Sequence, residues 1–145
     1  MNAVTYFEDV QIGDEELTPG MTLTQAHAAL YGGLTGDTTD EPGAIPDLLP
    51  ICLQTGLGWR GLRRPLAVLA FMSIDWKIHR AARVGDTIHG RARAVSKRSM
   101  REGGVLIEEH AIVDQHGDIL QSGRFVFLVA KRAAAGTTHA ESPAR

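Results

Sequence analysis

The chain of 145 residues has the length of one ordinary domain, which argues against a two-domain enzyme with separate cofactor and substrate lobes. Lys and Arg total 15 and Asp and Glu total 17, so the net charge is −2 and the general basic surface of a nucleic-acid-binding protein is missing. An apolar fraction of 43% suffices for a hydrophobic core without disulfide or metal support.

The first helix of the chain is predicted to follow Thr24. The Thr24 side chain is suited to cap a helix that runs to about Thr35, and Gly36 is suited to end it in the left-handed conformation. Residues 37–50 contain three prolines, so we expect a loop as far as about Asp47.

A second helix is predicted from about Asp47 to Trp59, with Asp47 as its cap. Apolar residues cover most of its circumference, which is typical of a helix that is buried all round. Gly56 and Gly58 lie within it and indicate a neighbour packed close to its backbone. Cys52 is expected to belong to the core.

The second half of the chain is rich in β-forming residues. Along residues 87–97, small or apolar residues alternate with polar or charged ones, which is typical of a strand. Residues 114–118 predict a hairpin loop with Gly117 in the left-handed conformation. Strands are expected at residues 66–79, 87–97, 105–113 and 119–130. We therefore predict an α+β protein in which a curved antiparallel sheet wraps around the second helix.

The two ends of the chain carry few structural signals. Residues 1–132 are predicted to form a single domain, and residues 133–145, with His139, a disordered C-terminal tail. No signal peptide is visible, and no apolar run approaches the ~20 residues of a membrane-spanning helix.

Cys52 is the only cysteine, which excludes an intrachain disulfide and a cysteine-rich zinc site. A cytoplasmic protein without a metal, a membrane or a nucleic-acid partner is the simplest interpretation.

Five segments carry turn and strand motifs in a recognisable order: residues 6–14, 24–37, 45–59, 71–86 and 112–118. The first ends in Gly13-Asp14, the second in Gly36-Asp37 and the fourth in Gly85-Asp86. Together they resemble the MaoC-like dehydratase family, which includes the (R)-specific enoyl-CoA hydratases, over residues 5–131. The resemblance implies the hot-dog fold.

The family adds water to acyl thioesters of coenzyme A or acyl carrier protein, or removes it. The resemblance implies that an Asp and a His activate the water, and that a backbone N–H at the start of the central helix polarises the thioester carbonyl. Asp37 matches the family's Asp, but Pro42 stands five residues later, where the family has its His. The family's mechanism therefore cannot be carried over intact.

Three side chains are the candidates for acid–base chemistry. Asp37 is either the remaining member of the dyad or a polar residue after a helix end. Asp40, next to Glu41, is either a solvated loop residue or part of a carboxylate pair that makes a general acid. His27 is either a surface histidine or a substitute for the missing one.

The binding groups of the substrate are predicted from the same resemblance. The oxyanion hole is expected at the backbone N–H groups of Gly43, Ala44 and Asp47. Guanidinium groups can bind the phosphates of coenzyme A, although cations after a helix also suit its dipole. The candidates for phosphate binding are Arg60, Arg63, Arg64 and Arg83.

Three functions are compatible with these residues. The resemblance implies an enoyl-thioester hydratase or 3-hydroxyacyl dehydratase of fatty acid metabolism, with a coenzyme A or carrier-protein thioester as substrate and no cofactor. The second hypothesis is a non-catalytic or half-site subunit that pairs with a dyad-bearing homologue. The third is a hot-dog acyl-CoA thioesterase, for which the central helix offers Gln54 and Thr55 but an acid only at Asp47. A homodimer or larger assembly is expected, because hot-dog domains pair and long strands have edges to protect.

Overall fold

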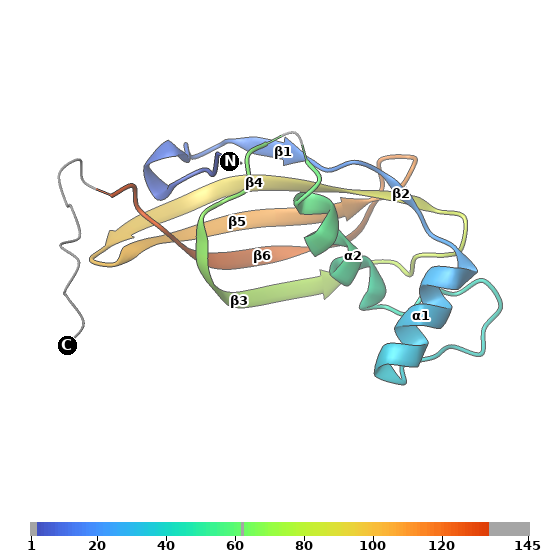
Figure 1. Ribbon diagram of the computed structural model, residues 1–145. Helices are drawn as coiled ribbons and strands as arrows, with labels where there is room; N and C mark the ends of the chain where they lie inside the picture. The colour runs from blue at the N-terminus through green and yellow to red at the C-terminus, as the bar shows by residue number, and fades with distance from the viewer. Residues whose placement is uncertain (1–2, 62, 134–145) are drawn as a thin grey trace, which may run out of the picture.

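The computed structural model describes residues 3–61 and 63–133, and its main strands form one antiparallel sheet (Figure 1). The elements in chain order are a 3-10 helix (Phe7–Asp9), β1 (Glu15–Leu17), β2 (Met21–Thr22), α1 (Gln25–Thr35), α2 (Leu49–Gly58), β3 (Val68–Ile78), β4 (Thr87–Met100), β5 (Gly103–Val113) and β6 (Ile119–Val129). The predicted tail at residues 134–145, including His139, lies outside the described residues.

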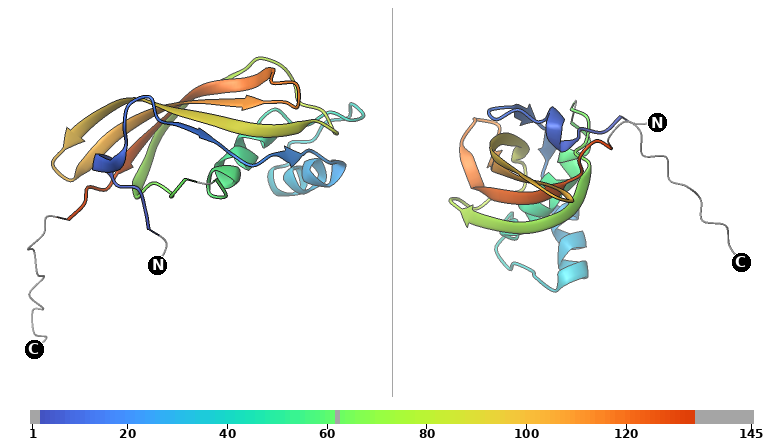
Figure 2. Two further views of the ribbon diagram at one scale, coloured as in Figure 1. Left: turned by 90° about the horizontal axis from the view of Figure 1, so that it is seen from above. Right: turned by 90° about the vertical axis from the view of Figure 1, so that its left-hand side faces the viewer.

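The strands follow the order β1-β4-β5-β6-β3, with β2 beside β4, and every pair is antiparallel. Figure 2 shows the sheet curving around α2, which lies against its concave face. The predicted α+β arrangement of a curved antiparallel sheet around a helix is therefore confirmed. Within the described ranges, no helix has both the length and the apolar character needed to cross a membrane.

The boundaries of α1 are those that local sequence predicts. The Thr24 hydroxyl accepts a bond from the His27 backbone N–H, and the His27 Nδ1 atom accepts one from the Thr24 N–H at 3.0 Å. Gly36 ends the helix with a φ of +74°. The apolar side chains of Leu30 and Leu34 remain 68% and 86% exposed, so α1 buries little apart from Ala28.

The start of α2 differs from the prediction. The helix begins at Leu49, and Leu48 rather than Asp47 occupies the N-cap position, so the prediction that Asp47 caps the helix is wrong. The reason is a tertiary contact: the Asp47 carbonyl accepts a hydrogen bond from the Gln121 Nε2 group of β6 at 2.7 Å. Pro50 lies in the first turn, where its missing N–H is tolerated.

Only one side of α2 is covered by the sheet. The buried positions of the helix are Leu49, Pro50, Gln54 and Leu57. Cys52 and Trp59 are exposed, so the predictions of a helix buried all round and of a core cysteine are wrong for the single chain. Nothing outside the helix lies within 4 Å of a Cβ built on Gly56 or Gly58, so the expected close neighbour is absent among the described residues.

The strands and the hairpin loop of the second half follow the prediction. The Asp114 Oδ1 atom accepts bonds from the backbone N–H groups of His116 and Asp118, and Gly117 has a φ of +82°. The core forms two clusters. One contains Leu23, Ala28, Ile45, Leu49, Ala82, Ile88, Ile112 and Leu120, and the other contains Phe7, Val10, Ala94, Leu106 and Val129.

Candidate functional site

Two ionisable side chains interrupt the inward face of β5. Alternate residues of a strand share one face, and on β5 the inward face carries Leu106, Glu108, His110 and Ile112 in turn. Leu106 belongs to one core cluster and Ile112 to the other. Glu108 and His110 therefore lie between the two apolar clusters, on the side of the sheet that faces α2.

The neighbouring strand β4 carries small residues opposite this pair. Ala92 is the register partner of His110, and Gly90 precedes Ala92 on the same face. A Cβ built on Gly90 would lie 1.8 Å from the Gln54 Nε2 atom, so the Gln54 side chain of α2 fills the space that Gly90 leaves. The small side chain of Ala92 leaves room for a cavity between α2 and the sheet.

The imidazole of His110 is held from two directions. Its Nε2 group donates a hydrogen bond to the Glu108 Oε2 atom at 2.9 Å, and the two side chains are only 10% and 8% exposed. Its ring stacks on Phe125, with 4.0 Å between the ring centroids and 17° between the ring planes. These contacts fix both the position and the orientation of the imidazole.

Two buried acceptors of this region lack a partner. Within residues 3–61 and 63–133, neither the His110 Nδ1 atom nor the Gln54 Oε1 atom has a hydrogen-bond partner. Because Nε2 carries the proton given to the Glu108 carboxylate, Nδ1 of the neutral imidazole is an acceptor. A buried polar atom without a partner costs about 1–3 kcal/mol. A ligand that donates hydrogen bonds would satisfy both atoms.

Glu16 of β1 brings a second carboxyl group to the same place. Burial raises the pKa of Glu16, and the negative charge of Glu108 raises it further, while Arg63 and His110 act in the opposite direction. Glu16 therefore keeps its proton to a higher pH than an exposed glutamate does. Burial sets this difference because the low-dielectric surroundings disfavour the ionised form.

These polar groups line a cavity of about 270 Å³ with a largely apolar wall. Its apolar lining includes Leu66, Phe71, Phe125 and Phe127. Trp59 and Phe71, which are 67% and 48% exposed, mark its open side between the end of α2 and β3. The cavity thus joins an aromatic wall, three ionisable side chains and an opening to solvent.

The predicted acid–base residues lie elsewhere. Asp37 and Asp40 are exposed in the loop after α1, and neither lines this cavity. Burial of the Tyr31 hydroxyl and the negative charge of Asp37 raise the pKa of Tyr31. His27 lies near the other end of α1, about 12 Å along the helix axis from Thr35, the last helical residue. The structure of one chain therefore does not bring His27 and Asp37 together.

The predicted oxyanion loop is tied to Arg83. The Arg83 guanidinium donates to the Pro42 carbonyl and to the Glu41 carboxylate, both at 2.9 Å. Ala44 forms an isolated bridge with Arg83, and its N–H donates to the Glu41 carbonyl at 3.1 Å. Gly43 has a φ of +75°, and Asp47 is exposed. Arg83 thus holds the predicted oxyanion loop in place.

The other predicted arginines follow α2. Arg60 and Arg64 are exposed, and the Arg63 guanidinium donates to the Asp14 carboxylate at 2.7 Å. Arg60 directly follows Trp59 at the open side of the cavity, whereas Arg63 and Arg64 line a separate hollow with Thr5, Tyr6 and Asp9. Arg83 is the predicted arginine that lies beside the loop after Asp37.

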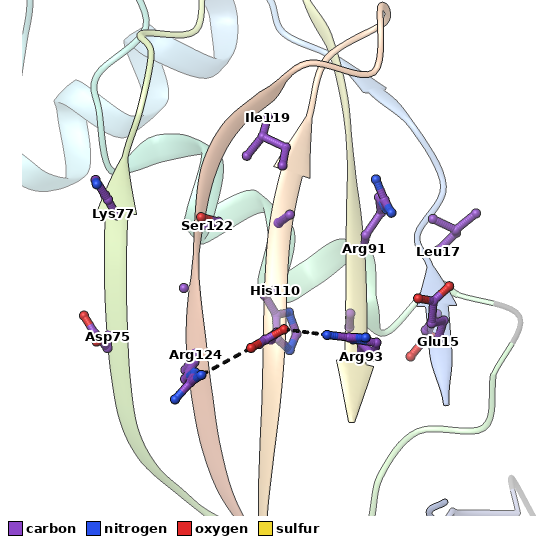
Figure 3. A pocket seen from close by; sticks show the side chains of 15 residues that line it. Glu15, Leu17, Asp75, Lys77, Arg91, Arg93, His110, Ile119, Ser122 and Arg124 are labelled. Carbon is purple, nitrogen blue, oxygen red and sulfur yellow. Dashed lines mark hydrogen bonds and ion pairs between the residues drawn. The ribbon is translucent and has the colours of Figure 1, made fainter. Parts of the chain in front are cut away.

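The outer face of the sheet carries a different hollow, in which charged side chains lie beside apolar ones such as Leu17 and Ile119 (Figure 3). There the Glu109 carboxylate accepts bonds from Arg93 at 3.0 Å and Arg124 at 3.3 Å. The bond from Arg93, with that from Arg124, holds the pKa of Glu109 below its usual value. These charges are paired with one another at the surface, and such pairs contribute little to stability.

Sequence reasoning missed Glu16, Glu108 and His110 as site residues, and it considered Gln54 for a thioesterase alone. The one available signal was the pair of polar residues at alternate positions of an otherwise apolar face of residues 105–113. Across the described ranges, no group of three or more His, Cys, Asp and Glu side chains is placed to hold a metal ion.

No protein-family model matches the sequence, and no curated protein matches it. Solved structures do match. The monoamine oxidase regulatory protein of Archaeoglobus fulgidus is 23% identical, with a TM-score of 0.82 over 90% of this chain and 97% of that chain. A MaoC-like dehydratase from Rhodospirillum rubrum is 15% identical, with a TM-score of 0.77 over 90% of this chain and 99% of that chain.

A third structure carries the name of the fold. A Mycobacterium tuberculosis protein with a double hotdog fold is 20% identical, with a TM-score of 0.71, and the match covers 97% of this chain and 52% of that chain. These likenesses show that the chain has the hot-dog fold, which the order of the sequence motifs predicted.

Proposed function

We propose that the chain is a hydro-lyase that interconverts a 2-enoyl thioester and a 3-hydroxyacyl thioester of coenzyme A or acyl carrier protein. The observation that carries the proposal is the cavity under α2, which combines an apolar wall with buried ionisable side chains. The similarity in fold to a MaoC-like dehydratase supports it. Hydration and dehydration are two directions of one reaction, so the cavity suits both.

The chemistry requires two kinds of group. The acyl chain needs an apolar surface, and the addition of water to the C2=C3 bond needs a base for the water and an acid for C2. One positioned proton-transfer group contributes about 10²–10⁴-fold to the rate. The apolar wall of the cavity can bind the acyl chain, and the carboxyl and imidazole groups of the cavity are suited to the proton transfers.

The predicted loop residues offer a second location for the chemistry. Asp37 remains the candidate with the best match to the family motif, with Asp40 and His27 as its predicted helpers. Asp37 is exposed in the single chain, so a role in catalysis would require a partner surface that covers it. Its contribution is tested by the substitution Asp37→Asn.

Association of two copies through β3 belongs to the same proposal. β3 is an edge strand of the sheet, and several of its apolar side chains are exposed. Pairing of this edge with a second copy would satisfy its open backbone groups and cover those side chains. The opening of the cavity at Phe71 lies on the same strand.

Hydration of crotonyl-CoA by the purified chain tests the function. We expect measurable but slow loss of the conjugated enoyl thioester, because Pro42 replaces the family's histidine. The substitution Ala92→Leu fills the cavity and is expected to raise KM or abolish turnover. Ala111→Leu adds the same bulk on the outer face and is the matched control. Absence of turnover with crotonyl-CoA and with longer enoyl thioesters would contradict the proposal.

A non-catalytic or half-site subunit is the second candidate function. The observation that favours it is the exposed Asp37 in a loop without a histidine. Co-purification with a dyad-bearing homologue, and turnover only in its presence, would support this role. A thioesterase ranks third, because the sheet-facing side of α2 presents Gln54 rather than a carboxylate. Release of free coenzyme A from saturated acyl-CoA would identify that activity.

A further inference from the structure

We infer that His110, oriented by Glu108, is the general base of this chain and that Glu16 is its general acid, acting on the C2–C3 unit of a short acyl thioester in the cavity under α2. The inference rests on the proposed function and names the residues that perform it. It moves the chemistry from the loop at Asp37 to the inward face of β5.

The geometry of His110 suits a base. The Glu108 carboxylate accepts the Nε2 proton, which leaves Nδ1 as the atom that can take a proton. The same carboxylate stabilises the imidazolium that forms, in the way that an aspartate supports the histidine of a catalytic triad. The His110 side chain lines the cavity, and its buried Nδ1 atom has no hydrogen-bond partner within the described residues. A substrate hydroxyl or a water molecule would fill that position.

Glu16 reaches the same cavity from a different strand. β1 pairs with β4 so that Glu16 lies beside Ala92, the residue opposite His110. The acid and the base thus stand on two sides of one small residue. Burial raises the pKa of Glu16, with a further contribution from Glu108, which favours the protonated form that an acid needs.

The reaction balances with these groups alone. In hydration, His110 Nδ1 takes a proton from water while the water oxygen bonds to C3. The C2=C3 electron pair moves to C2, which takes the proton of Glu16. His110 is then protonated and Glu16 ionised, and transfer of one proton between them through solvent restores the starting state. Dehydration follows the same steps in reverse.

The cavity also limits the substrate. Its volume of about 270 Å³ is below the range of about 300–1,000 Å³ that is usual for drug-sized ligands, which favours a short acyl group. Its open side lies at Trp59, and Arg60 follows directly in the chain. A thioester that enters there would carry its coenzyme A phosphates past this cation.

The test is crotonyl-CoA hydration by the full chain and by the variants His110→Gln, Glu16→Gln and Asp37→Asn. We expect His110→Gln to lose about 10²–10⁴-fold in kcat, as for the loss of one proton-transfer group. The control His79→Gln should stay within about threefold of wild type, since a group outside the reaction carries none of that factor, and Asp37→Asn should lose much less than His110→Gln. His79 bonds to Ser122 and does not line the cavity. Thermal unfolding of each variant shows whether it is folded.

The readout for Glu108 differs, because Glu108 is a positioning residue. Glu108→Gln removes the charge that stabilises the protonated imidazole, so the acidic limb of the kcat profile should move to lower pH. A merely structural residue would lower the amplitude of the profile without moving that limb. An unmoved limb in a folded Glu108→Gln variant would count against the pair.

The outcomes separate the two proposals. Full activity in His110→Gln with loss in Asp37→Asn would overturn this inference and keep the hydro-lyase function. Absence of turnover in every form would overturn that function, and nuclear magnetic resonance would then decide the location of the ligand. A saturable shift of the His110 side-chain signals on addition of crotonyl-CoA would support the acyl site in the cavity, and unchanged signals would overturn it.

Discussion

Glu16 and Asp114 are both shielded carboxylates, yet their surroundings shift their pKa values in opposite directions. Burial raises the pKa of Glu16, and the neighbouring charge of Glu108 adds to this. Burial also acts to raise the pKa of Asp114, but the N–H groups of Asp118 and His116 and the guanidinium of Arg80 outweigh it, so the net pKa is lowered. The two carboxylates differ in the number of hydrogen-bond donors around them. Asp114 accepts several bonds in a hairpin loop, whereas Glu16 faces a cavity.

The raised pKa of Glu16 predicts a dependence of stability on pH. The folded state binds the Glu16 proton more tightly than the unfolded chain does, so this stabilisation is complete below about pH 4.5 and is lost as pH rises through the raised pKa. Relative to Glu16→Gln, the wild type should therefore become less stable with rising pH in urea unfolding. Glu15→Gln, an exposed neighbour, is the control. A stability difference between wild type and Glu16→Gln that does not change with pH would contradict the assignment.

α1 shows how far local signals determine an element. Its cap at Thr24 and its end at Gly36 depend on residues within one turn of each boundary, and both were predicted correctly. The start of α2 depends on Gln121 of β6, which binds the Asp47 carbonyl, and it was predicted two residues early. A contact between residues 74 positions apart leaves no periodic or capping signal near the helix.

Two glycines of α1 provide a matched test of backbone conformation. A Cβ built on Gly33 or on Gly36 meets no atom within 4 Å, so packing does not distinguish them. Gly33 is helical, and Gly33→Ala should stabilise the fold by about 1 kcal/mol. Gly36 has a φ of +74°, and Gly36→Ala should destabilise it by about 1–2 kcal/mol. Chemical denaturation of the two variants measures both values. Equal effects would show that the end of α1 is not in the left-handed conformation in solution.

The molecule as a whole leaves one long edge of its sheet uncovered. Among residues 3–61 and 63–133, β3 pairs with no strand except β6, and Leu69 and Met72 on it are 56% and 53% exposed. Exposed apolar edge strands promote association between chains, and the exposed Leu30 and Leu34 of α1 extend the apolar surface of the chain. These surfaces support the predicted dimer.

Light scattering tests this association. We expect the chain to have about twice its mass of 15.7 kDa at micromolar concentration. The double variant Leu69→Lys, Met72→Lys should shift it to the monomer, because lysines on an edge strand oppose pairing. Ile119→Lys is the control, since Ile119 is 48% exposed but lies on β6, which is an inner strand of the sheet rather than its edge. A wild-type mass of one chain would contradict the predicted dimer, and loss of association in the control would assign the interface elsewhere.

The sequence by itself determined the curved sheet and its helix, because strand alternation, turn residues and caps act over a few residues. The order of motifs also led to the prediction of Asp37 as a catalytic residue, which the substitution Asp37→Asn tests. Only the tertiary structure decided that Glu16, Glu108 and His110 share a cavity. Their meeting depends on the register of β1 and β5 against β4 and on the small side chain of Ala92, and strand register joins residues that lie far apart in the chain.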